Sequence, residues 1–101
     1  MVRLLVLYNT PEDPQAFDQY YSEIHIPLAK QLPGLLRYTV SRNLAALGGN
    51  GKYYLIAELD WESMEAMQAA FASPIGAEIA ADVPKFASGG SSMMAYEVIE
   101  V

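Results

Sequence analysis

The single histidine, His25, is the side chain best suited to acid–base chemistry. An imidazole titrates near neutral pH, so it can accept or donate a proton where most side chains cannot. His25 follows Tyr21 by four positions and precedes Leu28 by three, which places it beside the apolar stripe of a predicted helix. This spacing leaves two interpretations open. His25 is either a general acid or base facing a pocket, or a structural histidine bonded to the backbone or to a tyrosine.

Seven tyrosines and a mid-strand glutamate form the second group of candidates. Aromatic rings with hydroxyl groups would line a pocket that suits a hydrophobic or phenolic ligand better than a charged one. Tyrosine is also favoured in strands for packing alone. Glu58 on an enclosed sheet face could shuttle protons, whereas on a solvated face it would only form salt bridges. We predict His25 as the catalytic residue, and as ligand-binding residues Tyr21, Tyr54, Glu58 and Tyr96.

The composition argues against several other kinds of chemistry. No cysteine occurs, so we predict no disulfide, thiolate metal site or cysteine nucleophile. With one histidine and neither an H-x-H nor an H-E-x-x-H spacing, we predict no metal site and no cofactor. The net charge of −6 disfavours nucleic acid as a partner, because phosphates attract a basic surface. The chain has no apolar run of about 18 residues and no targeting segment, so we expect no membrane span and a cytoplasmic location.

The elements that must position these residues follow the order β-α-β-β-α-β. Alternating and helical apolar spacings predict strands at 2–8, 35–44, 52–61 and 93–101, and helices at 14–32, 64–71 and 74–86. The first helix begins at either Thr10 or Asp13, and Ser63 is predicted to cap the second. Pro27 has no N–H to donate to the Glu23 carbonyl, so we expect a kink or break near residue 26.

This order predicts a single domain over residues 1–101, of the α+β class, with a ferredoxin-like fold in which helices cover one face of a four-stranded antiparallel sheet. The other face mixes apolar and polar side chains, with Tyr54, Ile56 and Glu58 among them. Only 18% of the residues are charged, against about 25% in typical domains, and 52% are hydrophobic. Such a chain has too little polar surface to cover itself. We therefore predict a homodimer joined through this face; the alternative is a monomer with an open sheet.

Two motifs resemble those of the EthD-like family, a branch of the dimeric α+β barrel superfamily. The first is YYSEIHIPLA at 20–29, followed by LPGL at 32–35. The second comprises FASP at 71–74 and AADVPKF at 80–86. The resemblance covers nearly the whole chain. It implies a homodimer whose two sheets form a closed barrel, with a ligand pocket between each sheet and its own helices.

The resemblance also implies a small catabolic protein linked to oxidative degradation, because members of this family accompany ether breakdown alongside a cytochrome P450 system. Superfamily relatives include cofactor-independent monooxygenases and isomerases. An enzyme of this kind would be a cofactor-independent oxidoreductase or isomerase acting on a small apolar, aromatic or ether-derived molecule. Only His25 falls on the family's recurrent histidine, and no second catalytic residue matches. The alternative is a non-catalytic binding protein that serves a partner oxygenase.

Overall fold

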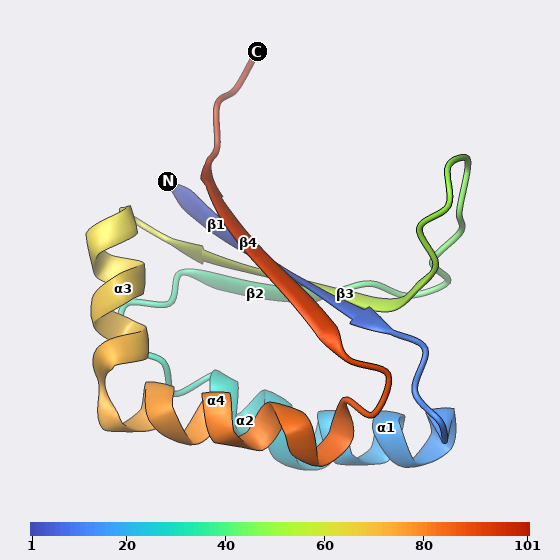
Figure 1. Ribbon diagram of the computed structural model, residues 1–101. Coiled ribbons are helices and arrows are strands. Elements are labelled where there is room, and N and C mark those ends of the chain that lie inside the picture. Colours follow the sequence, from blue (N-terminus) through green and yellow to red (C-terminus); the bar gives the residue numbers. More distant parts are fainter.

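Figure 1 shows the computed structural model, which describes all 101 residues as a sheet packed on a layer of helices. The elements in chain order are β1 (Val2–Asn9), α1 (Pro14–Tyr20), the π-helical segment η1 (Tyr21–His25), α2 (Ile26–Ala29), β2 (Arg37–Val40), β3 (Tyr53–Trp61), α3 (Met64–Ala72), α4 (Pro74–Phe86) and β4 (Ser91–Glu97). The sheet is antiparallel throughout, with the strand order β2-β3-β1-β4. This topology confirms the predicted ferredoxin-like α+β fold.

The predicted elements are all present, and apart from a π-helical segment within the first helix the differences lie at their ends. Asp13 is the N-cap of α1: its Oδ1 accepts a hydrogen bond from the Ala16 N–H at 3.1 Å. Ser63 caps α3 as predicted. Strand β2 has four residues, fewer than predicted, because the long connection at 41–52 leaves the sheet early. Strand β4 starts earlier and ends earlier than predicted, so that residues 98–101 form a tail.

Of the kink or break predicted near residue 26, the break does not occur. Pro27 lies within α2, and the backbone is right-handed helical on both sides of it. The adjustment occurs one turn earlier, in η1, where the N–H of Ile26 donates to the carbonyl of Tyr21 five residues before it. A π turn takes one extra residue into the helix, so the chain accommodates the missing proline N–H without breaking. The helix ends at Ala29, three residues before the predicted end.

The core lies between the sheet and the helices. Strand alternation turns one face of the two central strands toward the helices, and the buried residues of that face are Val2, Leu4, Val6, Tyr8, Ala57, Leu59 and Trp61. The Trp61 indole N–H donates to the Pro33 carbonyl at 2.9 Å. Gly34 has a φ of +73°, and a Cβ there would lie 3.4 Å from the Trp61 ring. The L-P-G motif therefore turns the chain after the helical segment and seats Trp61 in the core.

No helix covers the opposite face of the sheet (Figure 1). Arg3 and Asp60 pair across β1 and β3 on this face, with Nε to Oδ1 at 2.8 Å and Nη2 to Oδ2 at 3.2 Å. The connection at 41–52 and the tail at 98–101 both project beyond this face, away from the helices (Figure 1). Each carries exposed apolar side chains, Leu47 on the connection and Ile99 on the tail. Every helix is too short or too polar to cross a lipid bilayer.

Candidate functional site

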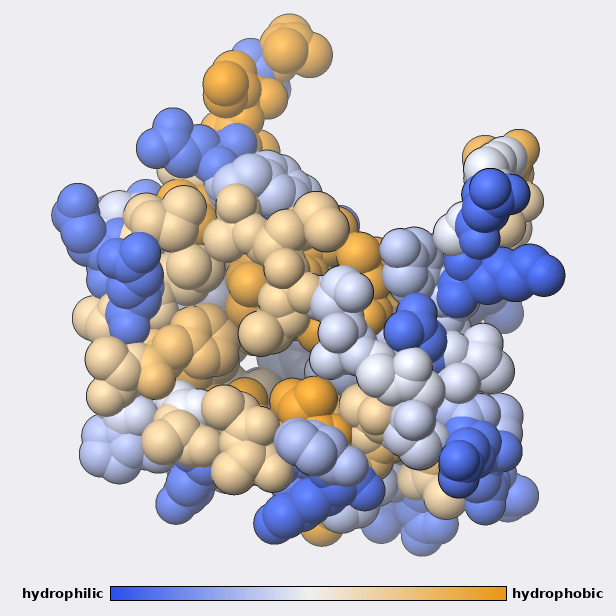
Figure 2. Space-filling view, in the orientation of Figure 1, coloured by the Kyte–Doolittle hydropathy of each residue, from blue (hydrophilic) through white to orange (hydrophobic).

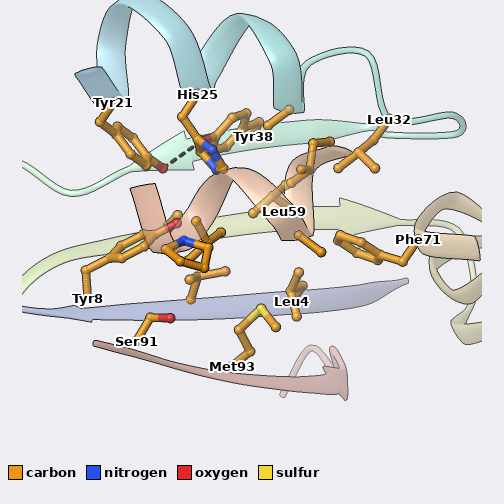
Figure 3. Close-up of a pocket in the computed structure, with 17 residues that line it drawn as sticks. Leu4, Tyr8, Tyr21, His25, Leu32, Tyr38, Leu59, Phe71, Ser91 and Met93 are labelled. Carbon is orange, nitrogen blue, oxygen red and sulfur yellow. Dashed lines mark hydrogen bonds between the residues drawn. The ribbon is translucent and has the colours of Figure 1, made fainter. Parts of the chain in front are cut away.

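A cavity of about 220 Å³ lies between the sheet and the helices (Figure 3). Fourteen of its seventeen lining residues are hydrophobic, and they come from all four strands and from η1, α2, α3 and α4. Four lining residues on α4 and β4 are exposed at the surface: Ala80, Pro84, Ser91 and Met93. Between these two elements the surface is hollowed and largely apolar (Figure 2). The cavity therefore opens to solvent between α4 and β4.

His25 is the polar centre of this cavity. It is the last residue of η1 and only 4% exposed. Its ring stacks on Tyr21, with ring centroids 5.3 Å apart, and packs against Phe86 at 4.6 Å. The Nδ1 atom lies 2.9 Å from Oδ2 of Asp82 on α4. The π-helical segment thus brings His25 into contact with the carboxylate of Asp82, which lies 57 residues further along the chain.

Asp82 has two polar partners. His25 contacts Oδ2, and the Tyr20 hydroxyl donates to Oδ1 at 2.5 Å. Burial favours the neutral acid, but the hydrogen bonds from Tyr20 and His25 and the charge of Lys85 outweigh it, so the pKa of Asp82 is lowered. An ionised carboxylate only accepts hydrogen bonds, so the N–H of the imidazole lies on Nδ1.

The other imidazole nitrogen, Nε2, forms no hydrogen bond within the protein, and it is not sealed off by protein atoms. Since Nδ1 is bonded to Asp82 and His25 lines the cavity, Nε2 is the ring nitrogen available to a ligand there. Burial lowers the pKa of His25 more than the hydrogen bond and charge of Asp82 raise it. The imidazole is therefore neutral at pH 7, with a lone pair available on Nε2. A base oriented by a carboxylate on its far side is an arrangement that suits general-base catalysis.

Three tyrosine rings line the cavity beside His25. The hydroxyl oxygens of Tyr21 and Tyr38 lie 2.6 Å apart (Figure 3), and the ring of Tyr8 meets that of Tyr21 edge-on at 5.6 Å. Burial raises the pKa of all three, that of Tyr38 to about 12. The three hydroxyl groups therefore keep their protons at neutral pH. No group of three or more His, Cys, Asp or Glu side chains is placed to hold a metal ion.

Two of the five predicted site residues, His25 and Tyr21, line this cavity. Glu58 and Tyr96 do not. They lie on the uncovered face of the sheet, where both contribute with Asp60 to raising the pKa of Arg3. The structure therefore groups them with the Arg3–Asp60 pair and away from His25.

Tyr54 was predicted on the uncovered face with Glu58, and it lies elsewhere. The register between β1 and β3 shifts at Tyr8 and Asn9, so strict alternation fails at this end of the sheet. The Tyr54 ring packs on Phe17 of α1 at 5.2 Å, and its hydroxyl donates to Asp18 at 2.7 Å. Tyr54 is not among the residues that line the cavity with His25.

Asp82 is a site residue that was not predicted from the sequence. Asp82 lies between Ile79 and Phe86 in the buried stripe of α4, at helical spacing of three and four residues. A carboxylate inside an apolar stripe is unusual, because burying an unpaired charge is costly. The position of Asp82 within an apolar stripe is visible in the sequence, but it does not identify His25 as its partner. Tyr38 and Tyr8 were missed because strand position alone does not separate cavity walls from ordinary packing.

The match to known proteins covers most of the chain. Residues 9–90 match the family described as the EthD domain, a stretch that includes both His25 and Asp82. The chain belongs to the EthD family. This EthD protein is 43% identical over 94 residues to an 11.0 kDa protein of the thcB–thcC intergenic region of Rhodococcus erythropolis, covering 93% of this chain and 91% of the relative.

Two solved structures extend the comparison. An ethyl tert-butyl ether D (EthD) family protein from Bacillus halodurans superposes on this EthD protein with a TM-score of 0.89 and 36% identity, covering 98% of this chain and 99% of the other. SnoaB from Streptomyces nogalater, described as a cofactor-independent oxygenase, superposes with a TM-score of 0.69 at 17% identity, covering 99% and 94% of the two chains. At that identity the likeness concerns the fold alone.

Proposed function

We propose that this EthD protein binds a small, largely apolar molecule, aromatic or ether-derived, in the cavity and that His25 takes a proton from it during oxidative catabolism. One observation carries this proposal: Nδ1 of His25 is bonded to Asp82 at 2.9 Å, which leaves Nε2 available to a ligand in the cavity. The Asp82 carboxylate would stabilise the imidazolium that forms when Nε2 is protonated.

The size and lining of the cavity indicate the kind of ligand. An apolar cavity of about 150 Å³ binds benzene, so a volume of about 220 Å³ suits one ring with small substituents. Apart from His25 and Ser91, the polar groups that reach the cavity are the tyrosine hydroxyls. A charged ligand would lose its hydration without gaining an oppositely charged partner. We therefore infer a neutral ligand that carries one weakly acidic group.

The relatives are compatible with a catabolic role. The Bacillus protein takes its family name from ethyl tert-butyl ether, and SnoaB shows that this fold accommodates oxidation without a cofactor. The family resemblance in the sequence adds a partner, a cytochrome P450 system, which stays a prediction. A cofactor-independent oxidoreductase or isomerase is the enzyme class that the proposal favours.

A homodimer joined through the uncovered sheet face belongs to the same proposal. A folded monomer of 11.1 kDa exposes about 5,700 Å². This chain exposes 6589 Å², an excess of roughly 900 Å², and a stable interface takes about 800 Å² from each partner. The face carries Leu5, Ile56 and Met94, and the two projecting segments at 41–52 and 98–101 would reach around a second copy.

The proton transfer can be tested with 4-nitrophenol, a single-ring phenol whose anion is coloured, and with its neutral ether, 4-nitroanisole. We expect the wild-type protein to bind both and to ionise the bound phenol at a lower pH than in water. His25→Gln should bind 4-nitroanisole unchanged but no longer promote ionisation, while its melting temperature stays near that of the wild type. Equal losses of stability and of ionisation in this variant would indicate a structural histidine.

The second candidate is a binding protein without chemistry, which holds an apolar metabolite for a partner oxygenase. The predominance of apolar side chains, fourteen of seventeen, favours this candidate. It predicts that 4-nitrophenol and 4-nitroanisole bind to the wild-type protein equally well. Between about pH 5 and 8 their affinities should not change with the titration of His25. Ionisation of the bound phenol in the wild type would rule it out.

A further inference from the structure

The hydroxyl pair formed by Tyr21 and Tyr38 has no role in the proton transfer described so far. The two oxygens lie 2.6 Å apart within the wall of the cavity, on the same side as the His25 ring (Figure 3). Tyr21 also stacks on His25, with centroids 5.3 Å apart. The pair is part-buried, with Tyr21 fully buried, and it lies beside the proposed base.

One hydrogen-bond donor of this pair has no acceptor within the protein. Two hydroxyl groups carry two protons, but only one proton can lie between the two oxygens. No hydrogen bond joins the Tyr8 hydroxyl to either oxygen, so the pair stands alone. One O–H of the pair therefore remains without an acceptor, because neither Tyr21 nor Tyr38 bonds to any acceptor outside it. The unused O–H can therefore be donated to an atom in the cavity.

We propose that Tyr21 and Tyr38 form a hydrogen-bond donor pair that binds the negative oxygen left on the ligand when His25 takes its proton. This inference rests on the proposed function of His25. In the step, an O–H bond of the ligand, or a C–H bond next to a carbonyl, breaks and an N–H bond forms at Nε2. The electron pair stays on the ligand and is held on its oxygen, directly or by conjugation. The imidazolium faces Asp82, and the oxyanion faces the tyrosine pair.

The surroundings of the pair suit this role. A hydrogen bond to an anion is stronger than one between neutral groups, and more so in an apolar cavity than in water. Burial raises the pKa of Tyr38 to about 12 and also raises that of Tyr21, so both stay protonated donors next to an oxyanion. The pair defines the ligand class more narrowly: a single-ring phenol, or a ring ketone that can form an enolate.

The test compares the anion and the neutral ether in tyrosine variants. Either single variant, Tyr21→Phe or Tyr38→Phe, keeps one hydroxyl with a free proton, so the decisive protein is the double variant. We expect the double variant to bind the 4-nitrophenol anion about tenfold more weakly, the loss that removal of one charged hydrogen bond produces. The pH at which the bound probe ionises should rise by about one unit, since one pH unit is a tenfold change. Binding of 4-nitroanisole should not change.

The controls separate this inference from the function on which it rests. Tyr53→Phe removes a hydroxyl from an exposed tyrosine outside the cavity and should leave all measurements unchanged. If the double variant ionises the probe like the wild type while His25→Gln does not, the tyrosine pair has no such role and the proposed function stands. If the wild type does not promote ionisation, both proposals are wrong. Thermal unfolding of each variant shows whether its fold is retained.

Discussion

Two buried aspartates form contrasting pairs on opposite faces of the sheet. Asp82 contacts His25 between the helices and the sheet, and Asp60 contacts Arg3 on the uncovered face. The hydrogen bond to Asp60 raises the pKa of Arg3 above its already high value, so the guanidinium stays charged at every accessible pH. Burial lowers the pKa of His25, so the imidazole is neutral at pH 7 and can take up a proton.

The comparison shows that a buried carboxylate does not by itself indicate a reactive site. Its partner decides the outcome. An arginine gives a permanent ion pair, which stabilises or orients an interface. A histidine gives a pair in which the imidazole can gain and lose a proton, and with it a positive charge. Only the second pair borders a cavity large enough for a ligand. Substitutions in each pair should therefore affect different properties: ligand ionisation for the reactive pair and dimer formation for the interface pair.

The largest effect is expected for Asp82→Asn. Without the carboxylate, the imidazolium has no negatively charged partner. Alternatively, the Asn amide donates to Nδ1 and favours the tautomer with the hydrogen on Nε2, which then cannot accept a proton. The pH at which bound 4-nitrophenol ionises should rise by about one to three units, measured by absorbance titration. The free energy of unfolding should fall by about 1–3 kcal/mol. Asp60→Asn is the matched control and should leave the ionisation of the probe unchanged.

The next largest effect is expected for Arg3→Glu, read out as oligomeric state. The substitution places a carboxylate beside Asp60 and Glu58 on a face that two copies would share, and like charges in an interface are strongly unfavourable. Sedimentation should show a dimer for the wild type and a monomer for Arg3→Glu. Lys30→Glu makes the same charge change at an exposed position at the end of α2 and should remain dimeric.

A second variant protects this test against misfolding. Met94 is half exposed in the single chain, so Met94→Lys costs little in the fold of one copy but places a charge in the proposed interface. A Met94→Lys protein that stays dimeric at low micromolar concentration would contradict an interface on this face. In that case the excess exposed area of the chain would need another explanation.

The third prediction concerns the pH dependence of stability. The pKa of His25 is lower in the folded protein than its ordinary value of 6.5, because burial disfavours the imidazolium. Below pH 6.5 the unfolded chain therefore binds more protons, and the free energy of unfolding falls as the pH falls. Each unit of pKa difference contributes about 1.4 kcal/mol. Urea denaturation between about pH 5 and 7 should show this slope in the wild type and a flatter profile in His25→Gln.

The contribution of Asp82 is lost in a lower pH range. Its folded pKa lies below the ordinary value of 3.8, so its stabilising effect is complete above that value and disappears as the pH falls through the folded pKa. Arg3 stays charged throughout, so replacing it should shift the whole curve without changing its slope between pH 5 and 7. A slope that persists in His25→Gln would assign the pH dependence to another group.

The sequence predicts the order of elements well because the signals are local. Alternation in the strands and three-to-four residue spacing in the helices identify all four strands and the helix that restarts at Pro74. The chain order β-α-β-β-α-β then leaves few ways to build the sheet. Failures occur where one residue changes the geometry. The register shift at Tyr8 and Asn9 moves Tyr54 to α1, and the π turn at Tyr21–His25 replaces the expected break.

The site was harder to predict because it is formed by distant parts of the chain. His25 could be identified alone, but its partner depends on how α4 packs against η1, which no local pattern specifies. The same holds for Tyr38, whose hydroxyl meets Tyr21 only after β2 joins the edge of the sheet. A polar residue inside an apolar stripe, as with Asp82, is the sequence feature that most directly points to such a meeting.

The smallest effect is expected for Tyr20→Phe, which removes the hydrogen bond at 2.5 Å to Asp82 and leaves the His25 contact in place. Since that bond lowers the pKa of Asp82, the variant should lose stability on acidification at a higher pH than the wild type. The carboxylate, with one donor fewer, becomes a stronger acceptor for His25, so bound 4-nitrophenol should ionise slightly more readily. Tyr54→Phe removes an equivalent bond to Asp18 outside the cavity and should change neither property. A loss of ionisation in Tyr20→Phe would show that Tyr20 positions the carboxylate, and the reactive unit would then be Tyr20, Asp82 and His25 together.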